Sequence, residues 1–328
     1  MPRRRLISHA LERLIGAFLF DRSVRRPDVI AALRHDAKSL SDRTPPTEDF
    51  WTVRRKHLQT LLLEGDPWEF LRWDPIATTM VKRGKANIRQ ELRHLQRRHD
   101  WKSRWRPALR EHTVGFPRPF YRYPKASGDL IHHAYHACRF EETTGVSLAD
   151  LSVIVEFGGG YGSMCRVLHQ LGFSGAYLIF DLPELSVIQR FFLPHVGIAT
   201  EKPGTTSFPA RGVVTASEVD DFKRLMRSRP PGRAAFIATW SLSEAPVDLR
   251  AAILSELTAF DAFLVAYGDD FAGVDNRAFF SRWRSGFPEH TWYELAPPSH
   301  YPKQAAYLFG AKSAVSAGTP QPSAVSVR

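Results

Sequence analysis

The second half of the sequence predicts an α/β fold in which helices cover both faces of a mainly parallel sheet. From residue 151 onwards, short runs rich in β-branched and aromatic residues alternate with helical segments. The first run leads into "FGGGYG", a glycine-rich turn between a strand and a helix. The last two runs are joined by a loop too short for a parallel crossover, which predicts an antiparallel hairpin.

We expect seven strands in this half of the chain. They are "SVIVEF", "AYLIFD", "GVVTA", "AFIATW", "AFLVAYG", "TWYELA" and "QAAYLFGA". Helices are expected at about 161–171, 183–193, 218–228 and 247–260. A seven-stranded, mostly parallel sheet with one antiparallel strand is the arrangement of Rossmann-like class I methyltransferases. A mainly helical N-terminal region, broken by prolines, precedes it.

The charge is distributed unevenly along the chain. Residues 1–125 carry 28 Lys and Arg against 14 Asp and Glu, a balance of +14, whereas residues 126–328 have a balance of −3. A basic half favours nucleic acid or another anionic partner. Because its basic residues alternate with acids, we expect a neutral or anionic small-molecule or glycan acceptor, and not nucleic acid. We expect three regions: a basic, mainly helical region that acts as a cap or in oligomerisation (1–125), a cofactor-binding domain (126–312) and a disordered tail (313–328). A homo-oligomer is compatible with this division.

The N-terminal stretch "MPRRRLISHALERLIGAFLF" has the pattern of an amphipathic helix. We interpret it as a helix packed on the rest of the protein, with an interfacial membrane anchor as the alternative. No apolar run is long enough to span a bilayer. The two cysteines, Cys138 and Cys165, form neither a disulfide framework nor a metal-binding pattern, so we expect a cytoplasmic protein.

The glycine-rich turn has a spacing that distinguishes two kinds of cofactor. A dinucleotide fingerprint starting at Gly158 would require glycine at position 163, which is Ser163. The sequence instead has an acid followed by alternating glycines, a spacing that resembles the first motif of methyltransferases dependent on S-adenosyl-L-methionine (SAM). The expected cofactor-binding residues here are Glu156, Gly158, Gly159, Gly160, Tyr161 and Gly162. By this resemblance, Glu156 lies near the amino-acid moiety of SAM.

Residues after two further strands complete the expected cofactor site. Asp181 and Leu182 follow the second strand, where an acid can accept hydrogen bonds from the ribose hydroxyls of an adenosine. NAD would use the same acid, so Asp181 predicts a ligand that contains adenosine and does not by itself predict methyl transfer. Trp240 and Ser241 follow the fourth strand and are expected to contact the cofactor as well.

Several blocks of the sequence together resemble a family of bacterial sugar O-methyltransferases. They are "VEFGGGYGSMCRVLHQLGF", "YLIFDLPELSVIQRFFL", "ATWSLSE", "LVAYGDDFAGVDNRAFF" and "YLFG", and the resemblance covers about residues 110–312. It implies a SAM-dependent transferase that methylates a sugar hydroxyl of a glycoconjugate or natural-product glycoside. The alternatives are an RNA methyltransferase that uses the basic half, and a non-catalytic interaction protein with this fold.

A hydroxyl acceptor calls for a general base or a metal ion. The candidate bases are His300, in the last hairpin loop, and Glu244, after the fourth strand. Candidate substrate contacts are His132, Tyr135, His136, Asp269 and Asp270. We expect no metal, with Mg²⁺ held by carboxylates as the alternative.

Overall fold

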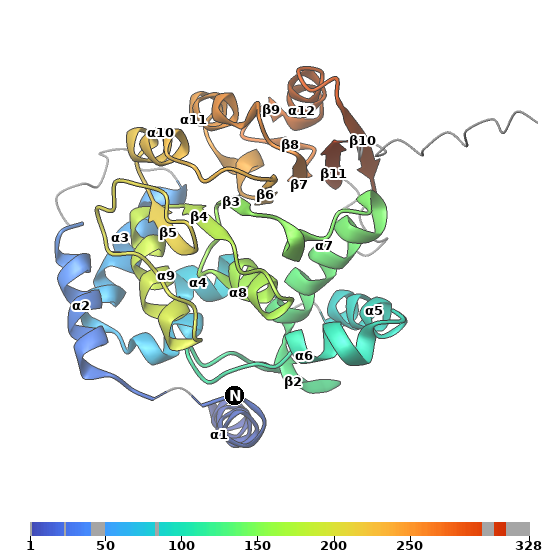
Figure 1. Cartoon of the computed structure of the whole chain (residues 1–328). Coiled ribbons are helices and arrows are strands. Elements are labelled where there is room, and N and C mark those ends of the chain that lie inside the picture. Colours follow the sequence, from blue (N-terminus) through green and yellow to red (C-terminus); the bar gives the residue numbers. More distant parts are fainter. Residues whose placement is uncertain (1, 23, 41–49, 83–84, 297–304, 313–328) are drawn as a thin grey trace, which may run out of the picture.

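A seven-stranded sheet forms the centre of the molecule, with the strand order β10-β11-β7-β6-β3-β4-β5 (Figure 1). The computed structural model describes residues 2–22, 24–40, 50–82, 85–296 and 305–312. The strands are β3 (Val153–Phe157), β4 (Ala176–Phe180), β5 (Gly212–Ala216), β6 (Ala234–Thr239), β7 (Ala262–Gly268), β10 (His290–Leu295) and β11 (Ala305–Lys312). All seven predicted strands are therefore confirmed.

The direction of the strands identifies the fold. Strands β7, β6, β3, β4 and β5 pair in parallel, and β11 lies antiparallel between β7 and β10. Every residue of β3 and β4 is buried, and all of them except Glu156 are apolar or aromatic, as expected for strands covered on both faces. This order, with its one antiparallel strand, is that of the Rossmann-like class I methyltransferase fold, so the predicted fold class is confirmed.

Two groups of helices cover the two faces of the sheet. Helices α7 (Gly128–Thr144), α8 (Ser163–Gln170) and α9 (Pro183–His195) share one apolar cluster with one face, and α10 (Val219–Arg227), α11 (Val247–Leu254) and α12 (Asn276–Arg284) share a second cluster with the other face. The four predicted helices are α8 to α11. Helix α12 and the preceding hairpin of β8 (Asp270–Phe271) and β9 (Val274–Asp275) were not predicted from the sequence.

The N-terminal region is mainly helical, as predicted. It contains α1 (Pro2–Leu19), α2 (Pro27–Lys38), α3 (Phe50–Glu64), α4 (Asp74–Thr79), α5 (Lys85–Gln96), α6 (Arg106–Ala108) and the short turns η2 (Pro67–Arg72) and η3 (Trp101–Trp105). Buried side chains such as Leu62 and Trp105 belong to the same apolar cluster as Ile154 and Ile179 of the sheet. The helical region and one sheet face therefore share one continuous core.

The Pro- and aromatic-rich segment 111–130 is partly ordered as strands. It contains the short antiparallel pair β1 (Pro119–Phe120) and β2 (Tyr123–Ser127), which leads into α7. The buried Glu111 carboxylate accepts a hydrogen bond from Ser127 N, and Ser127 caps α7. Backbone pairing and a buried acid therefore order a segment that has no clear periodicity in sequence.

Candidate functional site

The glycine-rich turn between β3 and α8 lies at the carboxyl ends of the parallel strands, where ligands bind in sheets of this kind. Gly158 has φ of +70°, and a Cβ there would lie 2.2 Å from Ser241 Cβ. A Cβ on Gly160, which has φ of +58°, would lie 3.3 Å from Met80 Sδ. The bare backbone therefore allows residues after β6 and α4 to approach the turn closely.

Two other residues of the turn face the protein interior. The Tyr161 ring is buried and packs against Phe70 and Phe192, at centroid distances of 5.5 and 5.2 Å. A Cβ on Gly159 would lie 2.9 Å from Glu156 Oε2. The side chain of Tyr161 therefore anchors the turn in the core, which leaves its backbone for the predicted cofactor contact.

The Asp181 carboxylate ties the turn to the end of β4. It accepts hydrogen bonds from Gly160 N and Leu182 N, both at 2.7 Å, and from Gln189 Nε2 at 3.2 Å. Burial raises the pKa of Asp181 to about 7, although these donors oppose the shift. An ionised carboxylate has about four acceptor positions, so one ligand hydroxyl can be added without displacing a donor. The ribose contact stays a prediction.

Glu156 lies beneath the turn and is almost fully buried. Its Oε2 accepts a hydrogen bond from the Tyr177 hydroxyl at 2.8 Å. Burial raises the pKa of Glu156 to about 8, so the neutral carboxyl dominates at neutral pH. The predicted influence of Glu156 on the amino-acid moiety of SAM would therefore act mainly through the position of the turn.

A groove joins the end of β4 to the N-terminal helices. It is lined by Arg54, Arg55, Leu58, Pro75, Ile76, Met80, Leu182 and Leu185. The Arg55 guanidinium is held 3.0 Å from the buried Glu184 carboxylate at the start of α9. The apolar side chains of this groove lie beside Leu182, which directly follows Asp181. Leu182 was predicted from the sequence, whereas the opposite wall of the groove, which the N-terminal region supplies, was not.

Trp240 and Ser241 follow β6 and border the glycine turn. Trp240 has φ of +73°, which is unusual for a residue with a side chain, and its N donates to Ala266 O at 2.7 Å. Ser241 Oγ donates to Phe157 O at 2.5 Å. Strained non-glycine residues cluster at functional sites, so this geometry supports the selection of Trp240.

Lys82, which the sequence analysis did not select, lies between several titratable groups. Its backbone N donates to Asp129 Oδ1 at 2.6 Å. Although the Lys82 residue retains exposed surface, desolvation lowers the pKa of its ammonium, and the nearby carboxylates of Asp129, Glu91 and Glu244 oppose that shift. Burial raises the pKa of Asp129 to about 7. A cation and three acids therefore gather near the glycine turn.

Glu244 is the one predicted base that the structure brings to this cluster. It ends η5 (Leu242–Glu244), is half-buried, and has a pKa raised by burial and lowered in part by Lys82. Asp269 instead lies 2.9 Å from the Arg277 guanidinium, and Asp270 is exposed on β8. His300 lies outside the described residues.

A chain of buried polar groups runs from α5 to β11 beneath this cluster. Tyr307 Oη lies 2.8 Å from His136 Nδ1. His136 Nε2 lies 3.0 Å from His132 Nε2, and His132 Nδ1 lies 2.9 Å from Glu91 Oε1. Burial lowers the pKa of both imidazoles well below the usual range, so both are neutral. His132 and His136 are buried, and the ring centroid of Trp240 is 6.4 Å from that of His136. Contact of these two histidines with a substrate stays a prediction.

Tyr135, the remaining predicted substrate residue, points toward α5. Its ring lies edge-on to His94 with centroids 5.2 Å apart, and it is almost fully buried. Burial raises the pKa of Tyr135 to about 12. Tyr135 therefore lies in the packing between α5 and α7, with its ring centroid 6.5 Å from that of His136, and its contact with a substrate stays a prediction.

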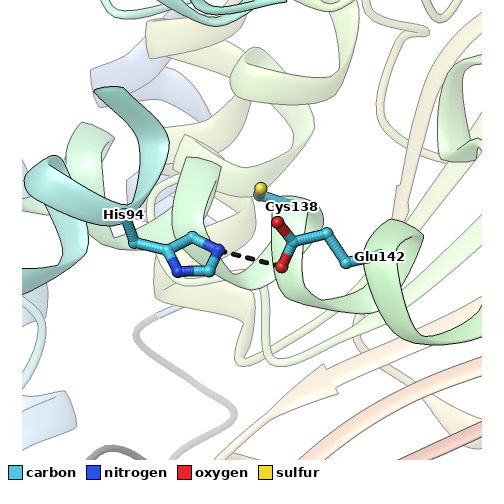
Figure 2. Close-up of side chains that lie close together, drawn as sticks. All are labelled: His94, Cys138 and Glu142. Carbon is cyan, nitrogen blue, oxygen red and sulfur yellow. Dashed lines mark hydrogen bonds and ion pairs between the residues drawn. The ribbon is translucent and has the colours of Figure 1, made fainter. Parts of the chain in front are cut away.

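One cluster of potential metal ligands lies between α5 and α7. His94, Cys138 and Glu142 bring a nitrogen, a sulfur and an oxygen within 4.8 Å of one another (Figure 2). This donor set would suit zinc. However, the Glu142 carboxylate already accepts from Arg98 at 2.8 Å and from Arg139 at 3.4 Å. These cations, and burial that raises the pKa of the Cys138 thiol, disfavour a metal ion here.

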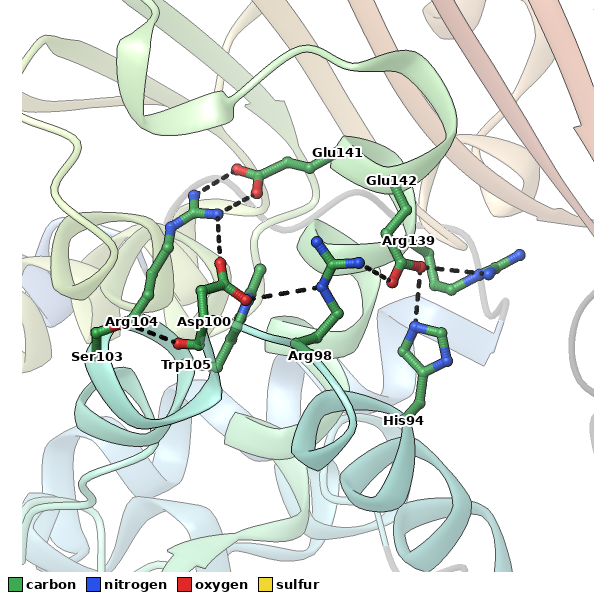
Figure 3. A network of polar contacts seen from close by, with 9 residues as sticks. All are labelled: His94, Arg98, Asp100, Ser103, Arg104, Trp105, Arg139, Glu141 and Glu142. Atoms are coloured by element: carbon green, nitrogen blue, oxygen red, sulfur yellow. Dashed lines mark hydrogen bonds and ion pairs between the residues drawn. The ribbon is translucent and has the colours of Figure 1, made fainter.

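The same cluster belongs to a larger network that explains part of the charge imbalance (Figure 3). Arg104 of the N-terminal region binds both oxygens of Glu141 on α7, at 2.6 and 2.8 Å, and Arg98 binds Glu142. Arg55 pairs in the same way with Glu184 of α9. Basic residues of the first half are thus matched by acids of the second half at their contact, which weakens the case for a nucleic-acid surface.

No family model and no curated protein matches the sequence. Among solved structures, the N-terminal domain of EvdMO1 with SAH bound is 12% identical, with 72% of this chain and 99% of that chain covered and a TM-score of 0.38. Magnesium protoporphyrin IX methyltransferase from Synechocystis PCC 6803 with bound SAM is 11% identical, with 56% and 80% covered and a TM-score of 0.36. Precorrin-6y C5,15-methyltransferase from Geobacter metallireducens GS-15 is 14% identical, with 57% of this chain and 89% of that chain covered and a TM-score of 0.35. At these TM-scores the similarities add nothing to the strand order, from which the fold is assigned.

Proposed function

We propose that this chain is a SAM-dependent methyltransferase, with the cofactor bound across the glycine turn and the apolar groove. The observation that carries this proposal is the juxtaposition of three features at the carboxyl edge of the sheet. They are the bare turn at Gly158–Gly162, the Asp181 carboxylate and the groove beside Leu182. Adenine would lie between Leu182 and Met80, with its ribose against Asp181.

The residues on the opposite side fit the acceptor in this proposal. Bound SAM supplies an electrophilic methyl group on a sulfonium. Glu244 would accept the proton of the acceptor hydroxyl as its oxygen bonds to the methyl carbon and the S–CH3 bond breaks, which releases S-adenosyl-L-homocysteine. The raised pKa of Glu244 makes the carboxylate a stronger base. Lys82 attracts an anionic acceptor, and Trp240 supplies an apolar surface for a sugar ring. Alignment of acceptor oxygen and methyl group contributes much of the acceleration.

The acceptor we propose is a sugar hydroxyl of a glycoconjugate or natural-product glycoside. The resemblance of the sequence blocks to sugar O-methyltransferases supports this class. Methyltransferases that act on an amide or exocyclic amine commonly carry a [DNS]-P-P-[YF] motif after the fourth strand. The sequence there is "ATWSLSEAP", without this motif, which argues against a nitrogen acceptor. The N-terminal region would act as a cap, since Pro75, Ile76 and Met80 form one wall of the cofactor groove. No step requires a metal ion.

A turnover assay tests the proposed function. The full chain is incubated with SAM and a panel of neutral and acidic glycosides, and separately with RNA, and formation of SAH and of methylated product is measured by mass spectrometry. We expect methylated glycoside whose yield is unchanged by added EDTA. Methylated RNA with no methylated glycoside would overturn the sugar acceptor, and SAM binding without turnover of any acceptor would favour a non-catalytic protein.

A further inference from the structure

The outer side of helix α1 carries an apolar stripe that no other part of the described chain covers. Leu11, Leu14 and Phe18 are 56%, 59% and 84% exposed. Residues three, four and seven apart lie on one side of a helix, so the three side chains form a continuous row. On the other side of the helix, Gly16 is buried, and so is Phe20, which directly follows the helix. The helix is therefore attached by one side and presents a second apolar side to solvent.

Ion pairs fix this orientation of the helix. Glu12 lies 2.9 Å from the Arg72 guanidinium, and Arg13 lies 2.6 Å from the Glu69 carboxylate. Figure 1 shows α1 on the outside of the molecule, near β2. These contacts of neighbouring helix positions hold the exposed stripe away from the core. Large apolar side chains that are exposed in such a row indicate an interaction surface.

The charge of the same segment indicates what this surface binds. Helix α1 contains four arginines and one acidic residue, a net charge of +3, and three of the arginines, Arg3 to Arg5, lie at its start. A helix with an apolar stripe and a strong positive charge is typical of segments that lie in the surface of an anionic bilayer. In the part of the chain that the structure describes, no helix is long and apolar enough to cross a membrane.

We propose that α1 docks the protein on the surface of an anionic lipid bilayer, independently of what the enzyme methylates. Leu11, Leu14 and Phe18 enter the boundary between headgroups and acyl chains, and the arginines contact lipid phosphates. A second copy of the chain is the weaker candidate, because pairing two α1 helices would bring two helices of charge +3 together. An anionic bilayer would bind both the apolar row and the positive charge of α1.

Vesicle co-sedimentation of the full chain tests this proposal. We expect binding to vesicles of phosphatidylcholine mixed with phosphatidylglycerol, and at least about tenfold weaker binding to phosphatidylcholine alone. High salt should reduce the difference. The triple variant Leu11→Ser, Leu14→Ser, Phe18→Ser should bind the anionic vesicles at least about tenfold more weakly. The control Val53→Ser, Val247→Ser changes exposed apolar residues elsewhere and should bind like the unmodified chain.

Two further measurements keep the outcome clear. Circular dichroism checks that the triple variant is folded, and a second variant with Arg3, Arg4 and Arg5 changed to Gln tests the charge without touching the stripe. Equal binding of the triple variant and the unmodified chain, or no binding to anionic vesicles at low salt, would overturn the proposal. A dimer seen by light scattering and lost in the triple variant would assign the stripe to a second copy and would overturn it as well.

Discussion

The two sides of the candidate site are assembled in different ways. The cofactor side depends mainly on residues between Gly158 and Leu182, which one strand–turn–helix unit and the next strand place together. The acceptor side takes Lys82 from the end of the α4 segment, Asp129 from α7 and Glu244 from η5. A site of the first kind follows from local spacing, whereas one of the second kind depends on tertiary packing.

The electrostatics of the two sides also differ. On the cofactor side, the buried acids Glu156 and Asp181 have raised pKa values and bind neutral donors of the protein. On the acceptor side, the Lys82 ammonium balances several carboxylates. Substitutions on the first side should therefore change cofactor affinity, and substitutions on the second side should change turnover.

Glu244→Gln should have the largest effect, and it should fall on turnover alone. Loss of a general base typically lowers kcat by about 10² to 10⁴-fold, while the affinity for SAM should stay unchanged. Steady-state kinetics and calorimetry measure the two quantities. Asp248→Asn, an exposed acid four residues away, is the matched control. Reduced SAM affinity with normal turnover in Glu244→Gln would place this residue on the cofactor side and break the comparison.

Asp181→Ala should weaken SAM binding by roughly 100-fold, because a charged acceptor of hydrogen bonds is lost. The change also removes the acceptor for Gly160 N, so a thermal melt must accompany the calorimetric titration. Asp220→Ala on α10 removes an exposed acid outside the site and serves as the control. Unchanged affinity in a folded Asp181→Ala variant would exclude the ribose contact.

The affinity for SAM should also depend on pH. The pKa of Asp181 is raised to about 7, so its carboxylate is mostly ionised at pH 8 and mostly protonated at pH 6. If the ionised form accepts the ribose hydroxyl, the affinity falls about tenfold as the pH falls across this range. Asp181→Asn should remove most of this dependence, whereas Glu156→Gln should retain it. An equally steep dependence in Asp181→Asn would assign the titration to another group.

Lys82→Met should have the smallest effect, a few-fold loss of turnover with a neutral acceptor. The Lys82 ammonium lowers the pKa of Glu244, so its removal should move the acidic limb of the kcat profile to higher pH by less than about one unit. Lys82→Arg keeps the charge and should keep the profile. A profile that does not move in Lys82→Met would separate Lys82 from Glu244.

Much of the fold and the cofactor side could be predicted from the sequence. Parallel strands buried on both faces leave continuous apolar runs, and the turn at Gly158 needs residues without a side chain because Ser241 lies against it. The Asp275 side chain caps α12 by accepting from Ala278 N, and this capping position could have indicated the helix that was missed.

The rest depends on contacts between distant segments. Met80, directly after α4, lies against Gly160, and the motif spacing says nothing of this contact between distant segments. His132 and His136 are four residues apart in the sequence, which predicts that they share one face of a helix. The sequence does not show that the pair is buried between Glu91 and Tyr307. Local spacing specifies a turn or a face, whereas tertiary packing decides which partner it meets.

Calorimetric titration of the full chain with SAM and with NAD tests the central claim most directly. Both ligands present an adenosine to Asp181, but only NAD presents a pyrophosphate to the glycine turn. We predict heat of binding with SAM at a single site, lost in Asp181→Ala, and no heat with NAD. Binding of NAD without binding of SAM would contradict the claim that this turn holds a methyl donor.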